Sequence, residues 1–214
     1  MRVGVACEYS GTVRDAFIRA GHEAISCDIL PSESDFGPHY QGDALEFVAN
    51  GDFDLLVAHP PCTYLSNSGV RWLWNGDGKE LPERWADLEK GAAFFRSLLE
   101  SDVPRVCIEN PVIHSHAAKL IGSSWSQSVQ PWQFGLGETK RTCLWLRNLP
   151  SLYPTEYVEG REARVWKMGP GPDRQKERSR FFVGIADAMA AQWGGLGPVE
   201  IPEAPRVQVG MFDA

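Results

Sequence analysis

The chain has 214 residues, of which 43% are hydrophobic and 23% are charged, and its net charge is −7. This composition is that of an ordinary globular protein, and the length allows one domain with a substantial core. No apolar run of about 18 residues is present, so a membrane span is not expected. The acidic balance argues against a protein that holds long duplex DNA by charge alone.

The cysteine pattern indicates whether the chain has disulfides or a metal site, and the N-terminal residues indicate its cellular location. The cysteines are odd in number and widely spaced, and no CxxC pair is present. This pattern argues against a disulfide framework and against a zinc site, so no metal site is predicted. The first residues run directly into a strand-like segment and lack the layout of a signal peptide, which indicates a cytoplasmic protein.

Strand and helix patterns alternate along the chain. Apolar runs predict strands over residues 2–7, 24–28, 53–59, 105–110 and 142–146. Helical spacing predicts helices over residues 12–20, 44–49, 81–100 and 182–193. We expect one domain over residues 1–197 and a C-terminal tail over residues 198–214, because the residues from Gly194 onward are rich in Gly and Pro. The alternation predicts an α/β fold whose mostly parallel sheet has helices on both faces.

The first strand-to-helix turn has residues that suit a ligand site, because ligands of such sheets bind beyond the carboxyl ends of the strands. The turn reads Cys7-Glu8-Tyr9-Ser10-Gly11-Thr12. Its glycine lets the backbone approach a ligand, and the N-terminus of the next helix favours negative charge. Asp28 ends the second strand, where an acid either binds a ribose hydroxyl or caps a turn. Together these residues predict a cofactor with an adenosine part.

A cysteine follows the third strand, in the segment His59-Pro60-Pro61-Cys62. The two prolines fix the backbone and remove two N–H donors, so the turn is rigid and extended. Such a turn would hold the thiol over the edge of the sheet, where a stabilised thiolate is a strong nucleophile. The alternative is a Pro-Pro turn followed by a merely buried cysteine.

Glu109 and Asn110 end the next strand and are followed by Pro111. Parallel strands end at the same edge of a sheet, so Glu109 is expected close to Cys62. A carboxyl group there can accept from a base or, when protonated, donate to a ring nitrogen. The alternative is a loop acid that caps a helix near His114.

In this order on consecutive strand ends, the motifs resemble those of the cytosine carbon-5 DNA methyltransferases. Residues 6–28 resemble the family's opening S-adenosylmethionine motif and the acidic position that follows it. His59 to Cys62 resemble its Pro-Cys nucleophile motif, and Ile108 to Pro111 its Glu-Asn motif. Residues 133–146 resemble its Phe-Gly and Gln-x-Arg-x-Arg region. The resemblance is greatest to short phage or prophage forms that lack a large target-recognition domain.

The resemblance implies a Rossmann-like, S-adenosylmethionine-dependent methyltransferase fold, and a role for each matched residue. The catalytic residues would be Cys62, Glu109, Asn110, Pro61 and Arg141. The cofactor S-adenosylmethionine would be bound by Cys7, Glu8, Tyr9, Ser10, Gly11, Thr12, Asp28, Ile29, Asp43, His59 and Pro60. The cytosine substrate would be contacted by Ser66, Asn67, Ser68, Arg71, Lys140 and Arg178.

In the chemistry that the resemblance implies, Cys62 adds to carbon 6 of cytosine and makes carbon 5 nucleophilic toward the methyl donor. Glu109 would stabilise the ring nitrogen, and Asn110 would orient the Cys62 turn. A base in duplex DNA would have to be flipped out to reach such a pocket. Residues 66–71 resemble a mobile loop that could close over it, or an ordinary surface loop.

The chain departs from the family pattern in several places. Glu138, Lys140 and Thr142 stand where the family has Gln-x-Arg-x-Arg, with Arg141 in that place if the register slips by one. Only residues 147–181 are available where the family has a large target-recognition region. Within them, the segment from residue 161 to 180 has seven basic and three acidic residues, and it suits phosphate contact or a solvated loop.

DNA is the first expected substrate, in a bacterial or phage-infected host cell. The acidic charge also fits a free cytosine nucleotide, such as dCMP or dCTP, methylated before incorporation. Two further alternatives are an amino-methyltransferase, which needs no cysteine, and a non-catalytic nucleotide- or DNA-binding protein of the same fold. The oligomeric state is left open.

Overall fold

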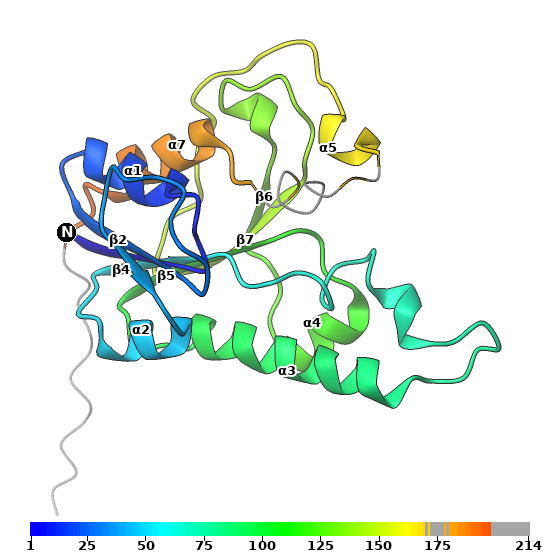
Figure 1. The fold of residues 1–214 in the computed structure, drawn as a ribbon. Helices are drawn as coiled ribbons and strands as arrows, with labels where there is room; N and C mark the ends of the chain where they lie inside the picture. The colour runs from blue at the N-terminus through cyan, green and yellow to red at the C-terminus, as the bar shows by residue number, and fades with distance from the viewer. Residues whose placement is uncertain (170, 172–177, 179, 198–214) are drawn as a thin grey trace, which may run out of the picture.

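The computed structural model describes residues 1–169, 171, 178 and 180–197. The strands are β1 (Arg2–Ala6), β2 (Glu23–Asp28), β3 (His39–Gln41), β4 (Leu55–Ala58), β5 (Arg105–Asn110), β6 (Gln127–Val129) and β7 (Thr142–Arg147) (Figure 1). The helices are α1 (Thr12–Arg19), α2 (Ala44–Asn50), η1 (Val70–Leu73), α3 (Pro82–Leu99), α4 (Ser115–Ile121), η2 (Pro131–Gln133), α5 (Arg164–Lys167) and α7 (Val183–Trp193). The predicted tail at 198–214 lies outside the described residues, as do Arg174 and Lys176 of the basic segment.

The strands form one sheet in the order β3-β2-β1-β4-β5-β7-β6. All pairs among β1 to β5 are parallel, whereas β7 runs antiparallel to both β5 and β6. The first five strands of this order follow the Rossmann arrangement, whose switch point lies between β1 and β4. The α/β, Rossmann-like fold class expected from the sequence is thereby confirmed.

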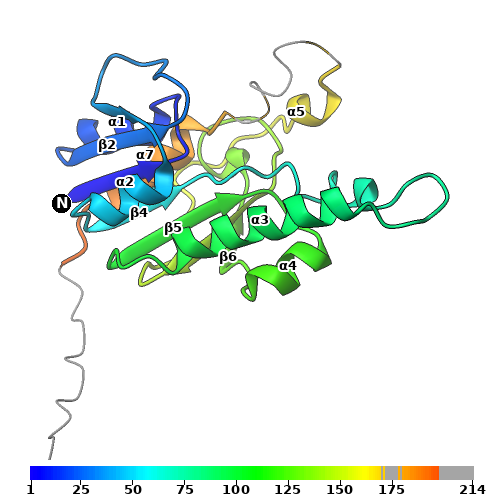
Figure 2. The ribbon, with the colours of Figure 1, turned by 60° about the horizontal axis from the view of Figure 1, so that its bottom comes forward.

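Helices cover both faces of the sheet. In Figures 1 and 2, α1 and α7 lie together on one face, and α2, α3 and α4 lie on the other. Phe17 of α1 and Trp193 of α7 belong to one core cluster, while Leu88 and Phe95 of α3 belong to the other. β4 and β5 are buried along their whole length, which explains why their sequences are continuous apolar runs.

Some element boundaries differ from the expected ones. β1 ends at Ala6 because Cys7 takes the left-handed conformation, with φ of 58°. β3, β6, η1, η2 and α5 were not predicted, and each has three or four residues, which is too short to show a period of apolar spacing. α4, of seven residues, was expected only as a helix near His114, without bounds. None of the described helices combines the length and the apolar composition needed to cross a membrane.

Candidate functional site

The first turn is built around a buried carboxylate. Glu8 is 4% exposed, and its two carboxylate oxygens accept hydrogen bonds from the backbone N–H groups of Val13 (2.7 Å) and Arg14 (3.2 Å). Glu8 therefore caps the N-terminus of α1. Gly11, with φ of 75°, makes the turn into the helix, where an added Cβ would meet the side chains of Arg14 and Ser34. The cap and the glycine together fix the path of residues 7–12.

The second strand ends in Asp28, which uses one of its two carboxylate oxygens in a hydrogen bond. One Asp28 oxygen accepts a hydrogen bond from the backbone N–H of Leu30 (3.0 Å), so Asp28 does cap a turn. Ile29 beside it is 76% exposed. Asp43 caps α2, because its carboxylate accepts from two backbone N–H groups at 2.9 Å. The charges of Asp28 and Asp43 also act on Cys7. Burial raises the pKa of the Cys7 thiol, and the two carboxylates raise it further.

A small cavity of about 80 Å³ lies between the first turn, the end of β4 and the residues before α7. It is lined by Cys7, Glu8, Tyr9, Ser10, His59, Arg180 and Phe181. Phe181 was not predicted as a site residue, and Arg180 was predicted only as part of the basic segment. The Phe181 ring lies 4.9 Å from the His59 ring, between centroids, and forms one wall. The cavity thus joins five predicted cofactor residues with two that come from the far end of the chain.

The cysteine turn is tied to the neighbouring strand. Ala58 lies opposite Ile108 in the parallel pairing of β4 and β5, so residues 59–62 and 109–110 emerge side by side. The Asn110 side-chain amide donates a hydrogen bond of 2.7 Å to the Pro60 carbonyl. Beyond the turn, the Cys62 carbonyl accepts from the N–H groups of Leu65 (3.1 Å) and Ser66 (2.9 Å). The backbone on both sides of Cys62 is therefore fixed.

Glu109 lies beside this turn and is held by His59. The distance from His59 Nδ1 to Glu109 Oε2 is 3.0 Å, and each side chain is 12% exposed. His59 Nε2 is buried and has no hydrogen-bond partner among the described residues. The pair connects the small cavity, which His59 lines, to the carboxyl group beside Cys62.

Charges of both signs act on the Cys62 thiol. Burial raises its pKa, the carboxylate of Glu109 raises it further, and the cations of Lys140 and Arg178 act in the lowering direction. The Lys140 ammonium is fixed by hydrogen bonds to the carbonyls of Arg178 (2.8 Å) and Arg180 (3.2 Å). The raised pKa favours the neutral thiol, and loss of the negative charge on Glu109 would favour the thiolate.

Arg141 lies on the other side of the chain from Lys140. Its side chain is exposed, and its guanidinium carbon is 5.9 Å from the centre of the Trp125 ring. Its charge acts on Cys143 but is not among those that act on Cys62. The cations whose charges act on the candidate nucleophile are therefore Lys140 and Arg178, and Arg141 is not among them.

The predicted loop after Cys62 contains turns and η1. Ser66 is buried and lies 2.9 Å from the Ser68 hydroxyl, while the side chains of Asn67, Ser68 and Arg71 are exposed. Gly69 packs so closely that an added Cβ would lie 2.5 Å from the Thr63 carbonyl oxygen. Asn67, Ser68 and Arg71 are thus the residues of this segment that a substrate can reach.

The described part of the basic segment forms a second polar surface. Arg161 lies 3.8 Å from the centre of the Trp132 ring, and Arg164 pairs with Glu138 at 2.9 Å. These two arginines and Lys167 line a cavity of about 580 Å³. Arg178, by contrast, belongs to the Cys62 site.

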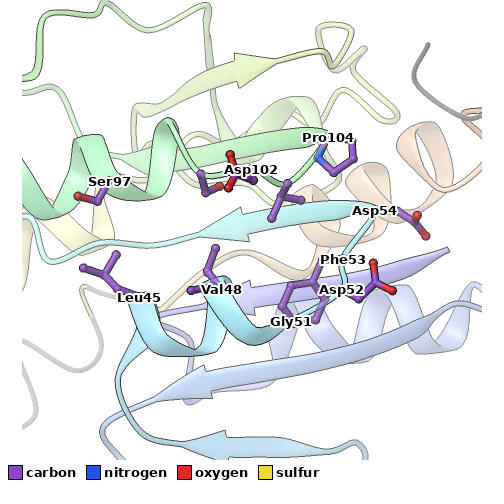
Figure 3. A pocket seen from close by; sticks show the side chains of 12 residues that line it. Leu45, Val48, Gly51, Asp52, Phe53, Asp54, Ser97, Asp102 and Pro104 are labelled. Carbon is purple, nitrogen blue, oxygen red and sulfur yellow. The ribbon is translucent and has the colours of Figure 1, made fainter. Parts of the chain in front are cut away.

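A further cavity, of about 500 Å³, lies at the opposite edge of the sheet (Figure 3). Its walls come from α2, the end of α3 and the loops that lead into β4 and β5, including Phe53 and Pro104. Asp52 and Asp54 on its rim are engaged by Arg2. Because it lies at the amino ends of the strands, it is separate from the site at their carboxyl ends.

No model of a protein family matches this chain, and no curated protein matches it. Its backbone is similar to that of several solved methyltransferases. A candidate DNA modification methyltransferase encoded within an E. coli prophage is 14% identical over 68% of this chain and 46% of that one, with a TM-score of 0.44. The Entamoeba histolytica methyltransferase EhMeth is 12% identical over 74% and 57% of the two chains, with a TM-score of 0.47. The S. pombe Dnmt2 methyltransferase is 12% identical over 78% and 54%, with a TM-score of 0.39.

The chain spans about half the length of these solved structures, since the similarity covers 46%, 57% and 54% of them. Identities this low assign no role to any single residue.

Proposed function

We propose that this chain transfers a methyl group from S-adenosylmethionine to carbon 5 of cytosine in DNA, with Cys62 as a covalent nucleophile. One observation carries the proposal. A cysteine on a fixed Pro-Pro turn lies within the electrostatic reach of a carboxyl group and an ammonium group at the carboxyl ends of the central strands. A nucleophile, an acid and a cation are the groups that addition to a cytosine ring requires.

The proposed steps assign a task to each of these groups. Cys62 Sγ forms a bond to carbon 6 of the ring, and Glu109 gives a proton to the ring nitrogen where negative charge develops. Lys140 stabilises the thiolate before the addition. After methyl transfer the carbon-5 proton leaves, the Sγ–carbon bond breaks, and the ring nitrogen returns its proton to Glu109. The products are 5-methylcytosine, S-adenosylhomocysteine and one proton.

The first turn and the end of β2 suit S-adenosylmethionine, which supplies an electrophilic methyl group when bound. Asp28 uses Oδ1 in its hydrogen bond to the Leu30 N–H, and Oδ2 would accept from a ribose hydroxyl. The exposed Ile29 offers an apolar surface for an adenine ring. The cavity beside Tyr9, Ser10 and Phe181 is also lined by His59, three residues before Cys62, and would receive the reacting end of the cofactor.

A free cytosine nucleotide is the second candidate substrate, and the net charge of −7 favours it. An acidic protein gains little from the long-range attraction that brings basic proteins to duplex DNA. Arg178 and Lys140 beside Cys62 would then hold the phosphates of one nucleotide.

The test is methyl transfer by the full chain. Purified protein would be mixed with labelled S-adenosylmethionine and, in separate reactions, with cytosine-containing DNA, dCMP or dCTP. We expect label on DNA cytosine, and one methyl group added to the base by mass spectrometry. Label only on a nucleotide would move the proposal to the free nucleotide, and label on none would support a non-catalytic binding protein.

A second experiment tests the covalent step directly. A fluorine at carbon 5 cannot leave as a cation, so a 5-fluorocytosine substrate should remain bonded to Cys62 after methyl transfer. Peptide mapping should find the adduct on the peptide that contains Cys62 and on none with another cysteine. An enzyme that methylates an amino group would form no adduct.

A further inference from the structure

We propose that His59 is a positioning residue that holds the bound methyl donor through one ring nitrogen and Glu109 through the other. The inference rests on the proposed function and extends it. His59 both lines the small cavity and forms a hydrogen bond with the carboxyl group beside Cys62.

The contact with Glu109 determines which nitrogen of His59 carries a proton. An ionised carboxylate only accepts hydrogen bonds, so Nδ1 must donate to Oε2 across the 3.0 Å distance. With Oε2 engaged, a proton on Glu109 belongs on the other oxygen, Oε1. Since Nδ1–H can donate to Oε2 in either protonation state of Glu109, it keeps Oε1 available for the ring nitrogen of the base throughout the reaction.

The other ring nitrogen, Nε2, must accept a hydrogen bond rather than donate one. When a neutral imidazole donates through Nδ1, its Nε2 is an acceptor. This Nε2 is buried without a hydrogen-bond partner in the described part of the chain. Buried polar atoms are normally paired, so an unpaired one in the lining of a cavity calls for a partner, which a bound ligand can supply. His59 lines the small cavity, so that partner is a donor group of the bound cofactor: an ammonium, amino or ribose hydroxyl group.

The two contacts together make His59 a link between the sites. A donor group that fixes Nε2 also fixes the ring plane, which then orients Nδ1–H toward Glu109. Phe181 supports this orientation from one side, with its ring centroid 4.9 Å from that of His59.

Two substitutions separate the roles, because asparagine can replace the Nδ1 donor and glutamine can replace the Nε2 acceptor. His59→Asn should weaken S-adenosylmethionine binding about tenfold, the effect of one lost hydrogen bond, and leave kcat at saturating cofactor near the wild-type value. His59→Gln should keep the wild-type Kd and lower kcat about 100-fold, because Glu109 is no longer held. His116→Asn, on α4 and away from the cavity, is the matched control and should change neither quantity.

For each variant, calorimetry with S-adenosylmethionine measures Kd, and steady-state methyl transfer at saturating cofactor measures kcat. The crossed result, in which Asn changes Kd and Gln changes kcat, supports the assignment of the cofactor contact to Nε2 and of the Glu109 contact to Nδ1. If both variants change the same quantity by the same factor, or if His59→Asn binds the cofactor as wild type does, the inference is overturned. A wild-type chain that transfers no methyl group would overturn the proposed function, which separates the two failures.

Discussion

Asn110 donates a hydrogen bond of 2.7 Å to the carbonyl of Pro60 and so ties the end of β5 to the turn that carries Cys62. The two residues are 50 positions apart in sequence, and the parallel pairing of β4 with β5 brings them together. The tether matters because the turn contains two prolines, which have no N–H groups to hold it in place.

Asn110→Ala should remove this tether. We expect kcat to fall about 100-fold because the nucleophile is no longer held in place. The free energy of unfolding should fall by about 1–3 kcal/mol, because the Pro60 carbonyl loses its partner. Methyl-transfer kinetics and urea unfolding would measure the two effects. An alanine variant with the wild-type kcat would show that the tether does not act on Cys62.

Cys62→Ala should abolish methyl transfer and leave S-adenosylmethionine binding intact, because the thiol acts on the base and not on the cofactor. Activity assays and calorimetry on the same preparation would show both. Cys107→Ala is the matched control, since that buried cysteine points into the core. It should lower stability but retain activity. Near-wild-type turnover in Cys62→Ala would exclude the covalent mechanism.

Glu109→Gln should lower the pKa of Cys62, because the carboxylate that raises it is gone. At a fixed pH below that pKa, a lower pKa means more thiolate, so alkylation of Cys62 by iodoacetamide should become faster while methyl transfer is lost. Lys140→Met should shift the pKa in the opposite direction and slow alkylation, because a cation that lowers it is removed. The pH dependence of alkylation, followed on the Cys62 peptide by mass spectrometry, gives the pKa for each variant. Shifts with the same sign in the two variants would contradict the assignment.

Asp28→Ala should weaken S-adenosylmethionine binding about tenfold through loss of one ribose hydrogen bond. Asp43→Ala is a useful comparison, because Asp43 caps α2 with its side chain. Its loss should lower the free energy of unfolding by about 1 kcal/mol. Calorimetry and thermal unfolding on both variants would separate a cofactor contact from a helix cap. An unchanged Kd in Asp28→Ala would remove Asp28 from the site.

The sequence alone was sufficient to predict the helices and strands that are long or buried on both faces. β4 and β5 are continuous apolar runs, and α3 and α7 carry helical spacing, so all four were predicted close to their observed bounds. β3 and β6 have three residues each and lie at the sheet edges, where exposed side chains leave no apolar pattern. Their existence depends on pairing with distant strands, which no local pattern specifies.

The site also has features that the sequence predicts and features that depend on packing. The closeness of Cys62 and Glu109 followed from the rule that parallel strands end at one edge. The wall formed by Phe181 depends on how the segment before α7 packs against β4, and no motif carries that information. The choice between Lys140 and Arg141 depends on a one-residue register, because neighbouring residues of an extended chain point to opposite sides.

The capping of α1 by Glu8 has a consequence for the kind of adenosine compound that can bind. In many nucleotide-binding folds this helix end is open, and its N–H groups receive a pyrophosphate. In this chain the Val13 and Arg14 N–H groups are already bonded to a carboxylate of the protein itself. A dinucleotide would bring phosphates against a like charge, whereas a sulfonium compound brings a positive charge and no phosphate. The first turn therefore suits a cationic cofactor better than a ligand that carries a pyrophosphate.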